Sequence, residues 1–248
     1  MYAVIGGSGL CKLPEFELRS RKVVRTPYGE PSCAFLFGQL VGQDVVFLAR
    51  HGYGHTIAPH EINYRANLWA LSQLEIDGIV AIASVGAINP TLKTGLLVIP
   101  DQIIDYTHGR PSTFFEGTEE PVRHIDFTWP YDASLRALIH SAADASEEPV
   151  HLGGCYACTQ GPRLETAAEV RRLAQDGADL VGMTGMPEAA LARELDIPYA
   201  HLALVVNAAA GIGESSQAIS HAQIAEVVEE GMGRVMAVLK SLVGLGRD

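Results

Sequence analysis

The chain has 248 residues, of which 48% are hydrophobic and 19% charged, a composition typical of folded proteins rather than of disordered or coiled-coil ones. Its formal net charge of −11 argues against nonspecific binding to nucleic acid, because Lys and Arg facing the phosphates supply most of that affinity. No apolar run approaches the roughly 20 residues of a membrane-spanning helix, and the first residues lack the pattern of a secretory signal. We therefore expect a cytoplasmic protein of one domain, residues 1–248, with no membrane or nucleic-acid partner.

Short runs rich in β-branched and apolar residues, bounded by Gly, Pro or Asp, predict strands that are mostly buried on both faces. In chain order these runs are Tyr2–Ile5, Ala34–Phe37, Val45–Ala49, Ile79–Ala83, Leu96–Ile99, Asp179–Met183 and His201–Val206. Between and after these runs, apolar residues recur at the spacing of an α-helix. This spacing predicts helices over Glu61–Leu74, Ser134–Ala143, Thr166–Gln175, Pro187–Glu194 and Ala222–Val243. The alternation predicts an α/β fold, with a single mixed β-sheet flanked by helices.

A glycine-rich turn, Gly6-Gly7-Ser8-Gly9, follows the first predicted strand. Such a turn can direct backbone N–H groups and the Ser8 hydroxyl toward an anion. It lacks the Gly-Lys-Ser/Thr of a P-loop and the G-x-G-x-x-G spacing of a dinucleotide site. A tight turn without a ligand is equally compatible with this stretch.

Arg50 and His51 come directly after the strand Val45–Ala49, at the end of the strand where α/β proteins usually bind ligands. The planar guanidinium of Arg50 matches the geometry of phosphate oxygens. A surface ion pair is the alternative.

Small and hydroxyl-bearing residues follow two more predicted strands, with Ala83 and Ser84 after one and Thr184 beside Met183 after the other. They could bind an anion, or the hydroxyls could simply cap a helix. Glu165, in the turn GPRLET, could likewise be an ordinary carboxylate near a helix N-terminus.

Cys155 and Cys158 have the C-x-x-C spacing, within a segment that reads as a strand. Residues three apart in a strand point to opposite faces and cannot share a metal without a turn. We therefore expect neither a zinc site nor a redox pair there, and no metal elsewhere.

The order of these motifs resembles the nucleoside phosphorylase family, in its trimeric branch of methylthioadenosine and purine nucleoside phosphorylases. The matching stretches are GGSGL near the start, RHGYGHTIAPHEINYRANLWAL from Arg50, MTGMPEAALARE from Met183, and the strand end at Asn207. The resemblance spans essentially the whole chain. It implies a homotrimeric pentosyltransferase that cleaves a purine nucleoside with inorganic phosphate as co-substrate and uses no cofactor.

The resemblance also implies roles for individual residues. Phosphate would be held by Ser8, Arg50, His51, Thr184 and the backbone around Ala83 and Ser84. Met183 would pack beside the ribose. As catalytic residues we expect Asn207, His51 and Glu165.

Asn207 and Glu165 predict which purine is bound. In adenine-selective relatives carboxylates occupy the positions that match Asn207 and Ala209. An amide can instead donate its NH₂ to a purine O6 and accept from N7–H. GPRLET resembles the GP-x-x-ET of 6-oxopurine phosphorylases, whose Glu accepts the purine N1–H. We expect hypoxanthine or guanine, with some 6-aminopurine turnover left open because an Asn amide can flip.

The sugar is predicted from His124, His221 and Ile219. The segment with His124 resembles the methylthio branch, in which a His from a neighbouring subunit reaches the 5′ pocket. Ile219 would add apolar surface, but His221 occupies a position where ordinary purine nucleoside phosphorylases have a His for the 5′-hydroxyl.

Together these features predict phosphorolysis of S-methyl-5′-thioinosine to hypoxanthine and 5-methylthioribose 1-phosphate in purine salvage. The alternatives are phosphorolysis of inosine or guanosine, phosphorolysis of methylthioadenosine, or a purine-nucleoside binding module without catalysis.

Overall fold

A mixed sheet runs through the centre of the protein, in a computed structural model that describes residues 1–7, 15–117, 121–216 and 221–245. Its strands are β1 (Tyr2–Gly6), β2 (Glu17–Lys22), β3 (Phe35–Leu40), β4 (Gln43–Ala49), β5 (Gly78–Ala87), β6 (Leu97–Ile99), β7 (Gln102–Asp105), β8 (Val150–Leu152), β9 (Cys155–Cys158), β10 (Leu180–Gly182) and β11 (Tyr199–Ala208). The main order is β2-β3-β4-β1-β5-β10-β9-β7, while β11 pairs with β5 and β6, and β8 pairs with β6. Strand β1 is parallel to β4 and β5, whereas β3–β4 and β5–β10 are antiparallel pairs.

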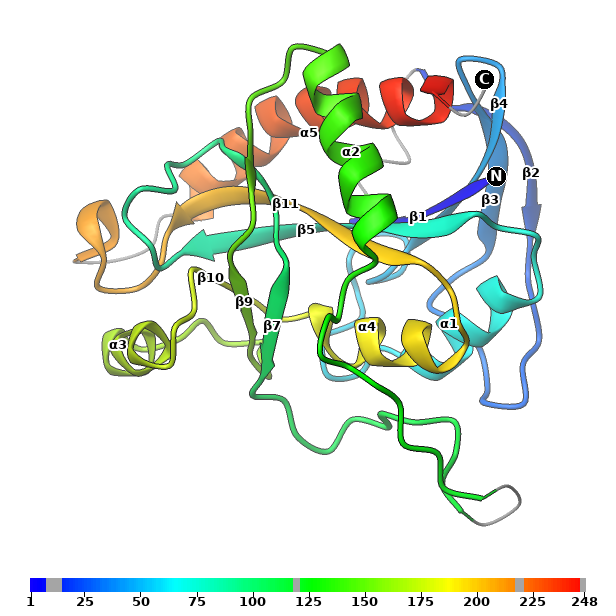
Figure 1. Cartoon of the computed structure of the whole chain (residues 1–248), viewed down its shortest axis with the longest axis horizontal. Coiled ribbons are helices and arrows are strands. Elements are labelled where there is room, and N and C mark those ends of the chain that lie inside the picture. Colours follow the sequence, from blue (N-terminus) through cyan, green and yellow to red (C-terminus); the bar gives the residue numbers. More distant parts are fainter. Residues whose placement is uncertain (8–14, 118–120, 217–220, 246–248) are drawn as a thin grey trace.

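Helices cover both faces of this sheet (Figure 1). They are α1 (Tyr64–Ser72), α2 (Ala133–Ala145), α3 (Ala167–Gln175), α4 (Gly185–Glu194) and α5 (His221–Leu245). Helices α2 and α5 lie on one face and α1 and α4 on the other, while α3 lies beside β9 and β10 (Figure 1). The predicted α/β fold with a mixed sheet is confirmed.

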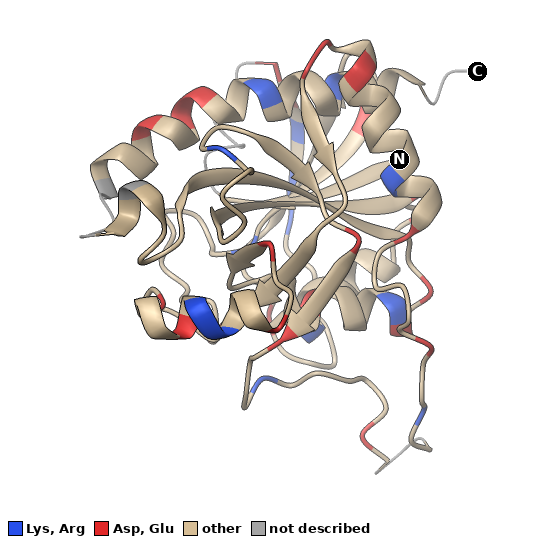
Figure 2. Ribbon diagram, turned by 60° about the vertical axis from the view of Figure 1, so that its left-hand side comes forward, with Lys and Arg blue, Asp and Glu red and all other residues tan. Residues whose placement is uncertain are grey.

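Alternating side chains of the central strands enter two separate cores. In β1, Ala3 and Ile5 pack in the core that includes α1 and α4, whereas Val4 packs in the core that includes α2 and α5. Because both faces are covered, the strands read as continuous apolar runs rather than as alternating ones. Charged residues lie mainly on the surrounding helices and loops (Figure 2).

Each predicted strand and helix is present, with shifted ends. The largest correction concerns β5, which was expected to stop at Ala83 and continues to Ala87. Its last residues are held by β10 on one side and β11 on the other. Ser84 therefore lies within a strand rather than after one.

Three strands were not predicted. All six residues of β2 are exposed, and the strand pairs along one side only, with β3 at the edge of the sheet. Strands β7 and β8 are only four and three residues long. None of the helices in the described ranges combines the length and hydropathy needed to cross a bilayer.

Candidate active site

A cavity of about 360 Å³ opens where the ends of several strands meet α5. Its walls come from β5, β10, β11, the turn after β4 and the loop before α3. Nine residues singled out from the sequence line it: Arg50, His51, Ala83, Ser84, Glu165, Met183, Thr184, Asn207 and Ala209. Residues distant in sequence, expected to hold phosphate or purine, therefore converge on one cavity.

Four other predicted residues are not placed in this cavity. Ser8 and Ile219 lie outside the described residues, as does the side chain of His221, the first residue of α5. His124 is exposed, in the long connection between β7 and α2, and does not line the cavity within a single chain. The roles of these four residues, like those of the nine that line the cavity, stay predictions.

Arg50 is buried at the floor of the cavity and is paired with Glu188 of α4. Its Nε and Nη2 donate to the two oxygens of Glu188 at 2.6 and 2.7 Å, and its Nη1 donates to the Ile82 carbonyl at 3.1 Å. The exposed fractions of Arg50 and Glu188 are 2% and 0%. A guanidinium has five N–H donors, so about two remain for a ligand. Sequence reasoning missed Glu188, whose charge compensates that of Arg50.

A buried hydrogen-bond chain continues from Glu188 beneath the site. The Tyr199 hydroxyl donates to Glu188 at 2.8 Å and lies 3.3 Å from Nε2 of His201. Nδ1 of His201 lies 3.2 Å from the Tyr131 hydroxyl. Burial, and to a lesser extent the charge of Arg50, lowers the pKa of His201 to about 3. His201 is therefore neutral at pH 7 and supports the ion pair without adding charge.

His51 is oriented by the turn that follows it. Nδ1 lies 2.9 Å from the Ile57 carbonyl, and since a carbonyl only accepts, Nδ1 carries the proton. Burial, followed by the charge of Arg50, lowers the pKa of His51 to about 4. The imidazole is therefore neutral at pH 7, and Nε2 is left as an acceptor.

The two histidines predict a loss of stability in acid. Each has a pKa below the ordinary value of 6.5, so below pH 6.5 the unfolded chain binds protons that the folded chain does not. Between pH 7 and pH 5 each histidine should lower the free energy of unfolding by about 2 kcal/mol. Urea unfolding at both pH values checks this, with His201→Gln as the control variant. The decrease in the free energy of unfolding from pH 7 to pH 5 should be smaller by about 2 kcal/mol in the variant. An equal decrease in both proteins would contradict a neutral His201 in the folded chain.

Asn207 reaches the cavity through an irregularity of the sheet. The register of β11 against β5 shifts between Val205 and Asn207, which leaves Val206 as an extra residue. Such bulges redirect the side chains that follow. Nδ2 of Asn207 donates to the Ala208 carbonyl at 2.6 Å, which leaves one N–H and the amide oxygen for a ligand.

Neither Thr184 nor Glu165 caps a helix with its side chain. Thr184 precedes α4, but its side chain makes no capping hydrogen bond. Glu165 precedes Thr166, and it is Thr166 and Glu169 that form the capping box of α3. Glu165 instead accepts a hydrogen bond from Thr159, a residue that sequence reasoning did not single out.

One wall of the cavity is apolar. Ile224, Val228 and Met232 of α5 line it, at spacings of four residues along one face of the helix. The wall could accommodate an apolar ligand group beside the polar end of the cavity.

The cysteine pair lies on β9, the strand expected there. Cys158 is buried, and its Sγ accepts from the Met186 N–H at 3.1 Å, while Cys155 is partly exposed. In the four ranges that the structure describes, no three His, Cys, Asp or Glu residues lie close enough together to hold a metal ion.

Comparison with known families covers almost the entire chain. The model of the phosphorylase superfamily matches residues 1–244. The chain belongs to the phosphorylase superfamily. The family resemblance of the sequence motifs is thereby confirmed, and with it the class of enzyme, a nucleoside phosphorylase.

Two relatives illustrate the range within this superfamily. A probable S-methyl-5′-thioinosine phosphorylase of Pseudomonas syringae is 50% identical, over 96% of each chain. The 6-oxopurine nucleoside phosphorylase of Pyrococcus furiosus is 44% identical, over 98% of this phosphorylase and 92% of its own length.

Solved phosphorylase structures have the same fold. A methylthioadenosine phosphorylase from an Antarctic soil metagenomic library superposes with a TM-score of 0.92 at 38% identity, covering 98% of this chain and 85% of the other. An adenosine/methylthioadenosine phosphorylase variant of Schistosoma mansoni, in complex with methylthioadenosine, gives 0.92 at 30% identity, covering 100% and 92%.

Proposed function

We propose that this phosphorylase cleaves S-methyl-5′-thioinosine reversibly, with inorganic phosphate, to hypoxanthine and 5-methylthioribose 1-phosphate. The observation that carries the proposal is that Glu165 and Asn207 line the same cavity as Arg50 and His51. An acid and an amide suited to a 6-oxopurine thus lie in one cavity with groups suited to phosphate. The relatives named as thioinosine and 6-oxopurine phosphorylases support this choice.

In the proposed reaction a phosphate oxygen forms a bond to the anomeric carbon while the bond to purine N9 breaks. The two free N–H groups of Arg50 donate to phosphate, and the neutral His51 accepts a hydrogen bond from a phosphate hydroxyl at Nε2. The proton that phosphate loses on becoming the ester balances the proton that the leaving base gains at N7. The sugar gains positive charge and the purine negative charge, and preorganised dipoles in a site with little water stabilise both. Fixing phosphate beside the sugar removes the entropic cost of a bimolecular encounter, worth on the order of 7 kcal/mol.

The departing base is stabilised at two of its edges. Asn207 donates its free amide N–H to O6 and accepts N7–H at Oδ1, which favours protonation of N7 as the glycosidic bond breaks. Glu165 accepts the purine N1–H. Adenine has no hydrogen on N1, so it would leave the oxygen of Glu165 that faces N1 without a donor, at a cost of about 1–3 kcal/mol.

The apolar wall of Ile224, Val228 and Met232 favours a 5′-methylthio group over a 5′-hydroxyl. His124 of a neighbouring subunit would close the 5′ end in a homotrimer, and light scattering tests that oligomeric state. His221 favours the second candidate, an inosine or guanosine phosphorylase.

One domain, residues 1–248, would carry the reaction in the cytoplasm, as a step of purine salvage that requires no cofactor.

A panel of four nucleosides tests the proposal. We expect kcat/KM to be highest for methylthioinosine, lower for inosine and guanosine, and at least about tenfold lower for methylthioadenosine, the factor that corresponds to one unpaired polar group. Release of free base should stop when phosphate is omitted. A preference for inosine would favour the second candidate, and nucleoside binding without base release would indicate a binding module.

A further inference from the structure

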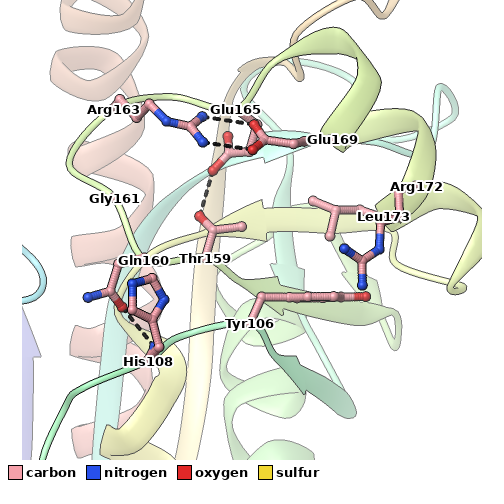
Figure 3. Close-up of a pocket in the computed structure, with 10 residues that line it drawn as sticks. All are labelled: Tyr106, His108, Thr159, Gln160, Gly161, Arg163, Glu165, Glu169, Arg172 and Leu173. Carbon is pink, nitrogen blue, oxygen red and sulfur yellow. Dashed lines mark hydrogen bonds and ion pairs between the residues drawn. The ribbon is translucent and has the colours of Figure 1, made fainter.

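Thr159 contacts two segments that line the candidate site, the end of β10 and the loop that carries Glu165. It follows the last residue of β9 and lines a second cavity, of about 410 Å³ (Figure 3). Glu165 lines both this cavity and the first. The Thr159 N–H donates to the Gly182 carbonyl at 2.8 Å, which fixes its backbone to β10. The side chain of Thr159 therefore starts from a well-defined position.

The hydroxyl of Thr159 is directed at Glu165 (Figure 3). Oγ1 lies 2.5 Å from Oε1 of Glu165 and 3.3 Å from the Gly182 carbonyl. The hydroxyl has one proton, and the closer, charged acceptor forms the stronger hydrogen bond. Thr159 thus fixes one oxygen of the Glu165 carboxylate.

The guanidinium of Arg163 is bound to a carboxylate other than that of Glu165. Arg163, two residues before Glu165, donates to both oxygens of Glu169 at 2.7 and 2.8 Å (Figure 3). Glu169 is held in place by the N–H of Thr166, which donates to it at 2.7 Å. Among the described residues, Glu165 has no ion-pair partner and no hydrogen bond other than that from Thr159.

We propose that Thr159 is a positioning residue for recognition of 6-oxopurines. Its hydroxyl donates a hydrogen bond to one oxygen of the Glu165 carboxylate and so fixes the plane of that carboxylate. The second oxygen is then oriented to accept a hydrogen bond from the purine N1–H. A carboxylate held by a neutral donor keeps most of its capacity as an acceptor, whereas one neutralised by Arg163 would not. This inference rests on the proposed function. It assigns part of the preference for 6-oxopurines to Thr159, a residue that is not itself proposed to contact the substrate.

The test compares Thr159→Val, which removes the hydroxyl at nearly constant volume, with Thr159→Ser, which retains it. For methylthioinosine, kcat/KM should fall roughly tenfold in the Val variant and less than about twofold in the Ser variant. For methylthioadenosine, which has no N1–H, kcat/KM should not change. In a Glu165→Gln background the Thr159→Val change should have little further effect. Thr91→Val, which removes a hydroxyl bonded to Asn89 in a loop outside the cavity, is the matched control.

Each outcome decides between the possibilities. Equal losses for both nucleosides, equal losses in the Val and Ser variants, or an unchanged Val variant would overturn the inference alone. A wild-type enzyme that cleaves methylthioadenosine and not 6-oxopurine nucleosides would overturn the proposed function and this inference with it.

Discussion

Replacing Glu188 with Ala is expected to lower the free energy of unfolding by about 3–5 kcal/mol, because it leaves the buried charge of Arg50 without its partner. The guanidinium also loses the two acceptors that fix its plane. We therefore expect the KM for phosphate to rise roughly tenfold, the effect of one misplaced charged hydrogen bond. Urea unfolding measures the first effect, and initial rates at varied phosphate measure the second.

Glu194→Ala provides a matched control for this prediction. Glu194 is also buried, and it accepts hydrogen bonds from Thr113 at 2.6 Å and from the Phe114 N–H at 2.7 Å, but it does not line the cavity. Its loss should destabilise the fold while the KM for phosphate stays the same. If both variants changed that KM equally, Glu188 would have no specific role in positioning Arg50.

Replacing Asn207 with Asp is expected to shift the preference from 6-oxopurines toward 6-aminopurines. A carboxylate repels the O6 of hypoxanthine but accepts from the 6-amino group of adenine. The ratio of kcat/KM for methylthioadenosine to that for methylthioinosine should rise about 5- to 150-fold, corresponding to about 1–3 kcal/mol. The two nucleosides, assayed at saturating phosphate, give this ratio directly.

Two further variants separate recognition from general damage. Asn207→Ala should slow both reactions and change the ratio much less, because it removes the amide without adding an acceptor. Glu165→Gln should raise the ratio, since the Gln amide can donate to N1 of adenine. An unchanged ratio in both Asn207→Asp and Glu165→Gln would mean that neither residue recognises the base edge.

Strands with a buried apolar sequence were predictable, and those without one were not. The runs at β1, β4 and β11 are apolar because helices cover both faces of the sheet. β2, with the sequence ELRSRK, has no buried face and is held by pairing with β3 and by Lys22 over the ring of Phe37, at 4.7 Å from its centroid. Such a strand depends on its neighbour, and its own sequence carries no signal.

The candidate site was predictable where one residue can bind a ligand alone, and not where two residues must meet. Arg50 follows a strand, so its position at a ligand-binding end could be inferred. Its partner Glu188 lies 138 residues further along the chain, and no local pattern links them. The bulge before Asn207 was equally invisible, because Val205 and Val206 look like any other strand residues. Thr159 was missed because the role that we propose for it depends on a contact with Glu165 across a turn.

The pairing of Arg50 with Glu188 has a consequence for how phosphate arrives. With that pair neutral overall and the chain at a net charge of −11, an approaching anion meets long-range repulsion rather than attraction. Inert salt shortens the reach of this repulsion to about 8 Å at physiological ionic strength. The association rate of phosphate should therefore increase as salt is added. In an enzyme that attracts its anion by electrostatic steering, the association rate decreases with salt instead.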